Sequence, residues 1–315
     1  MYTEHLRIPV GVGSLHAERV GRGGHPVVLL HGFGTCAFLW RAVAPRLADA
    51  GYTTIAIDLL GHGESDRPLD AGYGLAAQAE YIERALTSLR LPAVTVVGQD
   101  VGALVGMQLA SQRPRRVARL MLLNPPDPDD LPGPEIRTLQ RTSARAALSA
   151  NALFGAQSLL EPMLRAAVAD PARMSDLLVA RYLAPYVGSD GVGHLLQLAS
   201  AVELPEPEGP STVEVRAPVL LIHGAADPWT TTEVVKSFAA RLPQTAVSTG
   251  TLQGVGRLIA EDAPEPLLRL IRAFIESDGL AADRQAGEAA TMGKPAPATS
   301  PAAGATAAEG RQRIR

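Results

Sequence analysis

Short apolar segments alternate with helix-patterned segments along most of the chain, and this alternation constrains the fold more than any other feature. The apolar runs have the length of strands, and most of them are followed by a segment with apolar residues at helical spacing. This order is typical of a mostly parallel sheet with helices on both faces, because parallel strands need a long crossover between them. The sequence therefore predicts an α/β fold.

The strand and helix patterns assign most of the chain to one sheet. The predicted strands are residues 6–10, 14–20, 27–30, 53–59, 93–97, 117–123, 218–222 and 246–252. The predicted helices between them are residues 40–50, 75–89, 102–112, 232–242 and 265–276. Between two of the strands the alternation stops, and helix-like segments follow one another at residues 134–153, 158–168, 172–182 and 193–202. We therefore expect a helical block inserted between two strands of one sheet.

Composition and charge exclude several classes of function. The 315 residues include 29 basic and 32 acidic side chains, so the net charge of −3 argues against a nucleic-acid partner bound by bulk electrostatics. The one cysteine, Cys36, excludes an internal disulfide and a thiolate metal cluster. No apolar run approaches the roughly 18 residues of a membrane span, and no secretory signal pattern is visible. We expect a soluble, cytoplasmic protein without a membrane partner, a metal or a cofactor.

The strongest chemical signal lies between the predicted strand at 93–97 and the predicted helix at 102–112. There, Gly98 and Gly102 flank Asp100 at two residues on each side. This is the nucleophile-elbow pattern, in which the glycines allow a sharp strained turn and the central side chain stands exposed at a helix N-terminus. The helix dipole favours an anion at that position. An aspartate is ionised at neutral pH, so Asp100 is a competent nucleophile that leaves an ester on the enzyme.

Two further loops follow predicted strands. The loop that contains His31 and Phe33 is expected beside the elbow, where the backbone N–H groups of Phe33 and Val101 would form an oxyanion hole. We interpret His31 as a structural residue bonded to the loop backbone. The glycine-rich turn at residues 58–66 is interpreted as scaffold, without a catalytic role for His62.

These three segments, in this order and spacing, resemble the α/β-hydrolase fold family. The resemblance covers residues 4–277, and the aspartate elbow narrows it to the branch that contains epoxide hydrolases and dehalogenases. It implies a helical cap over the active site and the following division of the chain. Residues 1–126 and 216–278 would form the core, residues 127–215 the cap, and residues 279–315 a disordered tail rich in Ala, Gly and Pro.

The resemblance also implies two partners for the nucleophile. Asp227, in the segment that follows the strand after the cap, matches the acid of the family's triad. The family histidine should follow the last strand, but within the matching frame at residues 254–265 its position is occupied by Arg257. That histidine activates the water that hydrolyses the ester, and an arginine with a pKa above about 12 does not. His194, in the cap, is the only other histidine considered for the active site.

This departure leaves several functions open. The leading hypothesis is an enzyme, an epoxide hydrolase-like hydrolase that uses Asp100 against a small apolar electrophile. The second is a lyase, isomerase or cyclase on the same scaffold, with Asp100 as a base. Arg257 would either bind an anionic group of the substrate or pair with the carboxylate of Asp100 or Asp227. A ligand-binding homologue without turnover and a hydrolase with a displaced base are the remaining possibilities.

The sequence offers few clues to the substrate. Many dehalogenases have a tryptophan after the nucleophile, where this chain has Val101, so an epoxide is favoured over a halide. Epoxide hydrolases use cap tyrosines to protonate the epoxide oxygen, which makes Tyr182 and Tyr186 candidates for substrate binding, together with Trp229. Gly34 stands where the epoxide branch tends to have a proline. The oligomeric state is not predicted.

Overall fold

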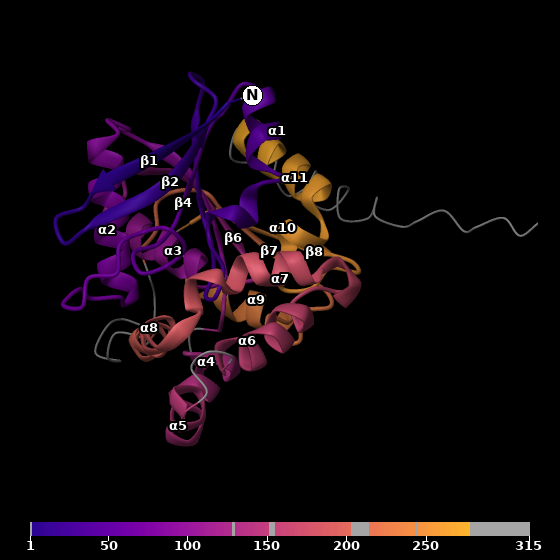
Figure 1. Ribbon diagram of the computed structural model, residues 1–315. Helices are drawn as coiled ribbons and strands as arrows, with labels where there is room; N and C mark the ends of the chain where they lie inside the picture. Colours follow the sequence, from indigo (N-terminus) through magenta and orange to yellow (C-terminus); the bar gives the residue numbers. More distant parts are fainter. Residues whose placement is uncertain (1, 128–129, 151–154, 203–213, 243–244, 278–315) are drawn as a thin grey trace, which may run out of the picture.

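The computed structural model describes residues 2–127, 130–150, 155–202, 214–242 and 245–277 (Figure 1). They contain an eight-stranded sheet in the order β1-β2-β4-β3-β5-β6-β7-β8. The strands are Thr3–Pro9 (β1), Ser14–Val20 (β2), Pro26–Leu30 (β3), Thr53–Ile57 (β4), Val94–Gln99 (β5), Val117–Leu123 (β6), Val219–Gly224 (β7) and Val247–Leu252 (β8). Only β2 pairs antiparallel, with β1 and β4, so the predicted mostly parallel sheet is confirmed.

Helices flank this sheet on both faces, with α2 and α3 on one face and α1 and α11 on the other (Figure 1). Their bounds are Ala44–Asp49 (α1), Leu75–Ser88 (α2), Val101–Gln112 (α3), Thr232–Ala240 (α9), Ile259–Asp262 (α10) and Pro264–Glu276 (α11). Each is held by an apolar stripe. In α11, for example, the buried residues are Leu267, Leu270, Ile271 and Phe274, at the spacing of one helix face.

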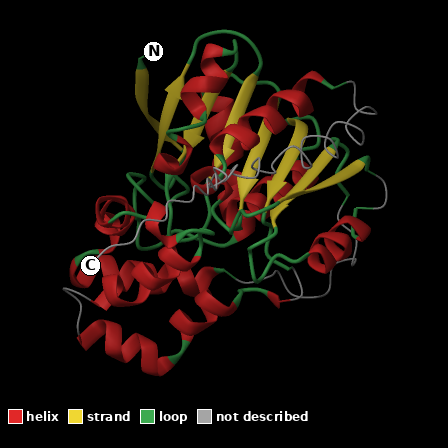
Figure 2. Ribbon diagram, turned by 90° about the vertical axis from the view of Figure 1, so that its right-hand side faces the viewer, coloured by secondary structure: helices red, strands yellow, loops and turns green. Residues whose placement is uncertain are grey.

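A group of helices without strands lies between β6 and β7 in the sequence. It contains α4 (Pro134–Gln140), α5 (Thr142–Ala150), α6 (Gly155–Ala166), α7 (Asp176–Leu183) and α8 (Gly188–Ala201), with short 3₁₀ helices η3 (Pro171–Arg173) and η4 (Ala184–Tyr186). These helices gather beyond one end of the sheet rather than on its faces (Figure 2). We call them the cap helices. Residues 151–153, expected to be helical, and 279–315, expected to be a tail, lie outside the described residues.

Three predicted helices are interrupted in the structure. The helix expected over residues 40–50 is confirmed only from Ala44 to Asp49 (α1): a separate 3₁₀ helix, η1 (Ala37–Trp40), precedes it, because Pro45 has no N–H to continue an earlier helix. The helix expected from residue 134 breaks at Arg141, whose ψ of 135° is extended. In the helix expected over 172–182, Ser175 is extended and accepts a hydrogen bond from the Leu178 N–H, so α7 begins there.

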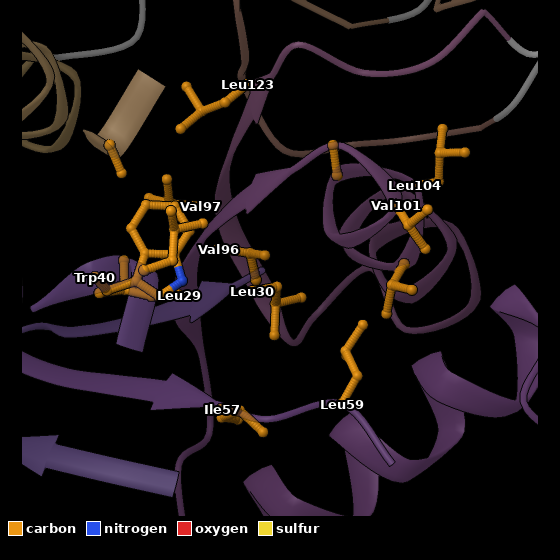
Figure 3. Close-up of a cluster of buried hydrophobic side chains, with 14 of the residues drawn as sticks. Leu29, Leu30, Trp40, Ile57, Leu59, Val96, Val97, Val101, Leu104 and Leu123 are labelled. Atoms are coloured by element: carbon orange, nitrogen blue, oxygen red, sulfur yellow. The ribbon is translucent and has the colours of Figure 1, made fainter. Parts of the chain in front are cut away.

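The central strands are apolar on both faces, as parallel strands covered by helices must be. Leu29 and Val97, in β3 and β5, are fully buried near Trp40, whereas Val101 and Leu104 of α3 lie on the opposite side of these strands (Figure 3). This dense packing fixes the ends of β3 and β5. The loops that follow these two strands therefore have rigid starting points.

Candidate active site

Asp100 occupies the turn between β5 and α3, with φ 55° and ψ −124°. A positive φ is unfavourable for residues other than glycine, so contacts with the surrounding structure must hold Asp100 in this conformation. The Asp100 N–H donates to the Leu123 carbonyl and the Ala103 N–H donates to the Asp100 carbonyl, each at 2.9 Å. Helix α3 comes so close to β3 that a side chain at Gly102 would collide with the His31 carbonyl oxygen. The turn thus projects the Asp100 side chain beyond the strand ends.

Both oxygens of the Asp100 carboxylate have a partner. Oδ2 accepts a hydrogen bond from the Phe33 N–H at 2.9 Å, and Oδ1 accepts one from Nη2 of Arg257 at 2.5 Å. The ion pair is largely removed from water, since the side chains are only 8% (Asp100) and 12% (Arg257) exposed. A Cβ atom at Gly32 would lie 2.6 Å from the Asp100 side chain, so glycine is required there.

A cavity opens at this ion pair and offers about 50 Å³ to water-sized molecules. Such a volume holds a few waters or a ligand of roughly four heavy atoms. Asp100 and Arg257 lie at its polar side, beside Thr35 and the loop of Phe33. The apolar wall is formed by Ile136, Leu160, Met163, Leu164, Ala167 and Leu258. The site therefore presents one ion pair to a small apolar chamber.

Asp227 and Trp229 follow β7 in the sequence, and the Trp229 ring lies near Arg257. The Asp227 Oδ1 atom accepts a hydrogen bond from the Trp229 N–H at 3.0 Å. Within the described part of the chain, the Oδ2 atom of Asp227 has no hydrogen-bond partner, although the residue is only 5% exposed. The guanidinium of Arg257 lies 5.0 Å from the centre of the Trp229 ring. Asp227 and Trp229 are not among the residues that line the cavity.

Asn124, which the sequence analysis did not single out, fixes the Arg257 loop. Its side chain donates to the carbonyl of Gly256 at 3.0 Å and to that of Arg257 at 2.7 Å. Its Oδ1 atom accepts a hydrogen bond from the Gly224 N–H at 2.9 Å. Asn124 is fully buried and has a φ of 41°, so it ties the ends of β6 and β7 to the segment that carries Arg257. An asparagine at the end of an apolar strand, before two prolines, was the available signal.

The residues of the apolar wall also escaped the sequence analysis. Leu160, Met163, Leu164 and Ala167 follow the i, i+3, i+4, i+7 spacing of one helix face. This periodicity was visible in the sequence. It did not say whether that face meets the core, solvent or a cavity.

The two cap tyrosines do not reach the cavity, contrary to the expectation from sequence. The Tyr182 hydroxyl donates to Oε1 of Glu261 at 2.5 Å, and Glu261 also forms a two-pronged pair with Arg41. Burial, and then the charge of Glu261, raise the pKa of Tyr182. Tyr186 lines a separate cavity of about 380 Å³ between α6 and α7. Glu261 therefore anchors the cap to the core instead of leaving Tyr182 for a substrate.

No histidine is found among the residues that line the cavity in the described chain. His31 accepts a hydrogen bond at Nε2 from the Leu59 N–H, which leaves its Nδ1–H to donate to the Gly32 carbonyl at 2.7 Å. His194 bonds to the Gly61 carbonyl at 2.6 Å, away from Asp100. Burial lowers the pKa of His62 to about 3. These histidines are neutral parts of the scaffold, in agreement with the structural interpretation of His31 and His62.

No metal-binding cluster and no membrane-spanning helix occurs in the described residues. They contain no group of three His, Cys, Asp or Glu side chains placed to hold a metal ion. None of the described helices is long and apolar enough to cross a membrane.

Val101, the second donor predicted for the oxyanion hole, is the first residue of α3, so its N–H is one of those without an acceptor inside the helix.

A family model described as the alpha/beta hydrolase fold matches residues 25–264. The chain belongs to the alpha/beta hydrolase fold family. This confirms the fold family that the sequence resembles. Individual members of this family are also similar to the chain in sequence or in structure.

Curated relatives align over limited segments. A haloalkane dehalogenase from Mycobacterium marinum is 39% identical over 123 residues, which are 39% of this chain and 39% of that protein. A putative carbamate hydrolase, RutD, from Variovorax paradoxus is 40% identical over 111 residues, which are 35% of this chain and 42% of that protein. The chain thus spans less than half the length of these relatives.

Solved structures are similar over most of the chain. Cfl2 from Burkholderia cenocepacia has a TM-score of 0.72 and 28% identity, and the match covers 86% of this chain and 95% of that one. The epoxide hydrolase CorEH has a TM-score of 0.70 and 22% identity, with 87% and 99% covered. The haloalkane dehalogenase DbeA from Bradyrhizobium elkani has a TM-score of 0.71 and 24% identity, with 87% and 97% covered. At less than 25% identity, the similarities to CorEH and DbeA show a shared fold alone.

Proposed function

We propose that this chain is a hydrolase-type enzyme in which the Asp100 carboxylate attacks a small, mostly apolar electrophile, either an epoxide or an alkyl halide. The observation that carries the proposal is the position of that carboxylate. It stands on a strained turn at the polar side of an apolar cavity, with one oxygen on the Phe33 N–H and the other on Arg257. The dehalogenases among the relatives and the epoxide hydrolase of the same fold support this class of substrate.

The contacts of Asp100 assign separate roles to its two oxygens. Oδ1 would attack the electrophilic carbon, forming a C–O bond while the bond to the leaving group breaks and the leaving group takes the electron pair. Oδ2 would become the carbonyl oxygen of the ester and would stay on the Phe33 N–H, with the Val101 N–H as the proposed second donor. Arg257 orients the carboxylate through its contact with Oδ1, and the leaving group departs on the opposite side of the attacked carbon.

The second step, hydrolysis of the ester, lacks the usual base. A water must lose a proton as it attacks, and an arginine does not accept it. The cavity is lined by no histidine in the described chain, and Asp100 itself is consumed by the ester. We therefore propose that the alkyl-enzyme ester accumulates and that its release limits turnover.

The size and lining of the cavity narrow the choice of substrate. A space of about 50 Å³ favours electrophiles of roughly two to four carbons. The preference for an epoxide rested on cap tyrosines, and neither Tyr182 nor Tyr186 lines this cavity. Arg257 is the one cationic side chain among the lining residues that the structure describes, and it does not favour an epoxide over a halide.

Intact-mass measurement tests the proposal. The native chain, Asp100→Ala and Arg257→His are each incubated with small epoxides and alkyl bromides. We expect an adduct of one alkyl group on the native chain, none on Asp100→Ala, and faster loss of the adduct in Arg257→His, where an acceptor for the water proton has been restored. A native chain that forms neither adduct nor product with any electrophile would sink the proposal.

The missing histidine favours a second candidate, a lyase, isomerase or cyclase in which Asp100 removes a proton from carbon. In that reaction the ion pair with Arg257 would orient the base, and an anionic intermediate would rest on the guanidinium. Conversion in H₂¹⁸O separates the two candidates, since the second predicts product without solvent oxygen and without an adduct.

A further inference from the structure

We infer that the chain forms a twofold-symmetric homodimer in which the β8 strands of two copies pair antiparallel and join the two sheets into one. The outer edge of β8 is the interaction surface, and a second copy of the same strand is its partner. The pairing does not involve Asp100 or the cavity, so it is independent of the proposed function.

Strand β8 is an open edge of the sheet. It pairs with β7 on one side, and no other described strand pairs with it. Thr249, in the middle of the strand, is exposed, and Val247 and Thr251 on either side are half-buried. An open edge presents main-chain N–H and C=O groups on which a further strand can form hydrogen bonds.

The printed contacts with β7 show which main-chain groups of β8 point outward. The carbonyls of Ala246 and Leu252 each accept a hydrogen bond from the β7 side at 2.9 Å. The register between the two strands is unbroken, and main-chain groups alternate between the two sides of a strand. The N–H and C=O groups of Val247, Thr249 and Thr251 therefore point away from β7, toward the open side.

The opposite edge of the sheet, β1, differs from β8 in its protection against pairing (Figure 1). Strand β1 contains Glu4, His5 and Arg7 and ends at Pro9, and charged residues and proline on an edge discourage association. Strand β8 has the sequence VSTGTL, without a charge, a proline or a bulge, and its valine and threonines favour extended structure. The sequence of β8 is thus suited to a further strand.

The geometry of β8 fits a second copy of itself. In an antiparallel pair centred on Thr249, this residue lies opposite its own copy, and Val247 lies opposite Thr251 of the second chain. All the outward-pointing residues then form hydrogen-bonded pairs, each of which exchanges both main-chain bonds. A register shifted by one residue would leave some of them unpaired. Threonines directly opposite each other also form a favourable cross-strand pair.

Helix α9 would complete the interface. The twofold axis runs perpendicular to the sheet, so the same face of the two sheets is continuous, and α9 packs on β7 and β8 on one such face. The charged residues within α9 are Glu233 and Lys236, both exposed, so two copies can approach without an excess of like charge. A stable interface buries at least about 1,000 Å², and the paired strands and the neighbouring α9 helices would share this area.

Sedimentation equilibrium and light scattering of the native chain provide the first test. We expect a mass of twice 33.0 kDa at chain concentrations of about 100 µM, with dissociation on dilution. A native chain that remains monomeric at this concentration would overturn the inference, whichever segment or other partner covers β8.

Charges at position 249 test the register of the pair. Thr249→Lys and Thr249→Glu each place two like charges opposite each other on the axis, and each should weaken association by at least about 100-fold. An equimolar mixture of the two variants should form a heterodimer, because the charges are then opposite. Thr3→Lys, the same substitution on β1, is the control and should leave the native dimer unchanged. A dimer that survives Thr249→Lys, or a mixture that stays monomeric, would contradict this interface.

Thr249→Pro is the second variant and does not depend on charge. The Thr249 N–H points away from β7, so a proline removes a donor to the second copy and leaves the hydrogen bonds to β7 in place. We expect a monomer whose circular dichroism spectrum is that of the native chain. A folded Thr249→Pro chain that dimerises as strongly as the native one would refute the pairing of the β8 edges.

Discussion

Two buried aspartates follow strands of the same sheet but have different surroundings. Asp58, after β4, is 2% exposed and its carboxylate has three hydrogen bonds: Oδ1 accepts from the Ala37 N–H at 2.6 Å, and Oδ2 bonds to His16 at 2.8 Å and to the Glu64 N–H at 2.9 Å. Asp100, after β5, has one hydrogen bond on each oxygen and faces a cavity. Asp58 holds three segments together, whereas Asp100 has fewer donors and lies open to the cavity.

This difference distinguishes a structural carboxylate from the proposed nucleophile in this fold. Both residues are buried, both follow apolar strands, and both are near a conspicuous loop. What distinguishes them is the number of hydrogen-bond donors around each carboxylate and whether the carboxylate lines a cavity. Substitutions at the two positions should therefore affect different properties, namely stability at Asp58 and reactivity at Asp100.

The largest effect is expected on reactivity. Asp100→Asn should slow formation of the alkyl adduct by at least about 10³-fold, because an amide is a far weaker nucleophile than a carboxylate. The rate is followed by intact mass over time with an excess of a small epoxide or alkyl bromide. His16→Gln, which perturbs the Asp58 cluster instead, is the control and should react at nearly the native rate. An Asp100→Asn chain that reacts as fast as the native one would refute the assignment.

Stability should respond in the opposite way. Asp58→Asn is expected to lower the free energy of unfolding by about 3–5 kcal/mol, since it breaks the buried pair with His16 and leaves that residue only the more distant, exposed Glu64 carboxylate. Asp227→Asn, at a carboxylate with a single hydrogen bond, should change it by less than about 1 kcal/mol. Guanidinium denaturation measures both. Similar losses of unfolding free energy for the two variants would show that the number of hydrogen bonds does not distinguish these carboxylates.

The two cap tyrosines give a smaller contrast of the same kind. Tyr182→Phe removes the hydrogen bond to Glu261 and should cost about 1.5–3 kcal/mol, the usual range for a bond to a charged group. Tyr186→Phe should cost less than about 0.5 kcal/mol, because its hydroxyl has no hydrogen-bond partner in the described chain. Thermal and denaturant unfolding compare the two variants. A greater loss for Tyr186→Phe would show that the contact with Glu261 does not anchor the cap.

The smallest effect concerns pH. Burial alone would lower the pKa of His16, but the hydrogen bond and charge of Asp58 outweigh it and raise the pKa. A folded-state pKa above the unfolded value means that this stabilisation is complete below about pH 6.5 and is lost as pH rises through the folded pKa. The native chain should therefore lose more free energy of unfolding than His16→Gln between pH 6 and pH 9. Parallel pH profiles of unfolding would contradict this.

The sequence predicted the parts of the site that depend on local pattern. The apolar strand before Gly98 and the helix after Gly102 predicted the position of Asp100. The resemblance to the family singled out Arg257, which the structure places on the Asp100 carboxylate. The sheet itself was predicted because parallel strands covered on both faces must be apolar throughout. Asp227 was placed correctly after β7, on the same alternation of strands and helices.

The remaining features depend on contacts between distant segments. Tyr182 is 79 residues from Glu261 in the sequence, and only the packing of α7 against the core brings their side chains together. The direction of α6 is equally a product of packing, so its apolar face did not identify a cavity wall. The interaction of Asn124 with the Arg257 loop joins the ends of β6, β7 and the segment after β8, which no local pattern describes.

Peptide mapping of the native chain tests the central claim most directly. The chain is incubated with a two- to four-carbon epoxide or alkyl bromide in H₂¹⁸O, digested, and the peptide that contains Asp100 is analysed by mass spectrometry. The account expects one alkyl group on Asp100 and product that does not exceed the slow rate at which this ester disappears. An unmodified, unlabelled Asp100 peptide, together with abundant product that contains solvent ¹⁸O, would mean that water attacks the substrate directly and that Asp100 is not the nucleophile.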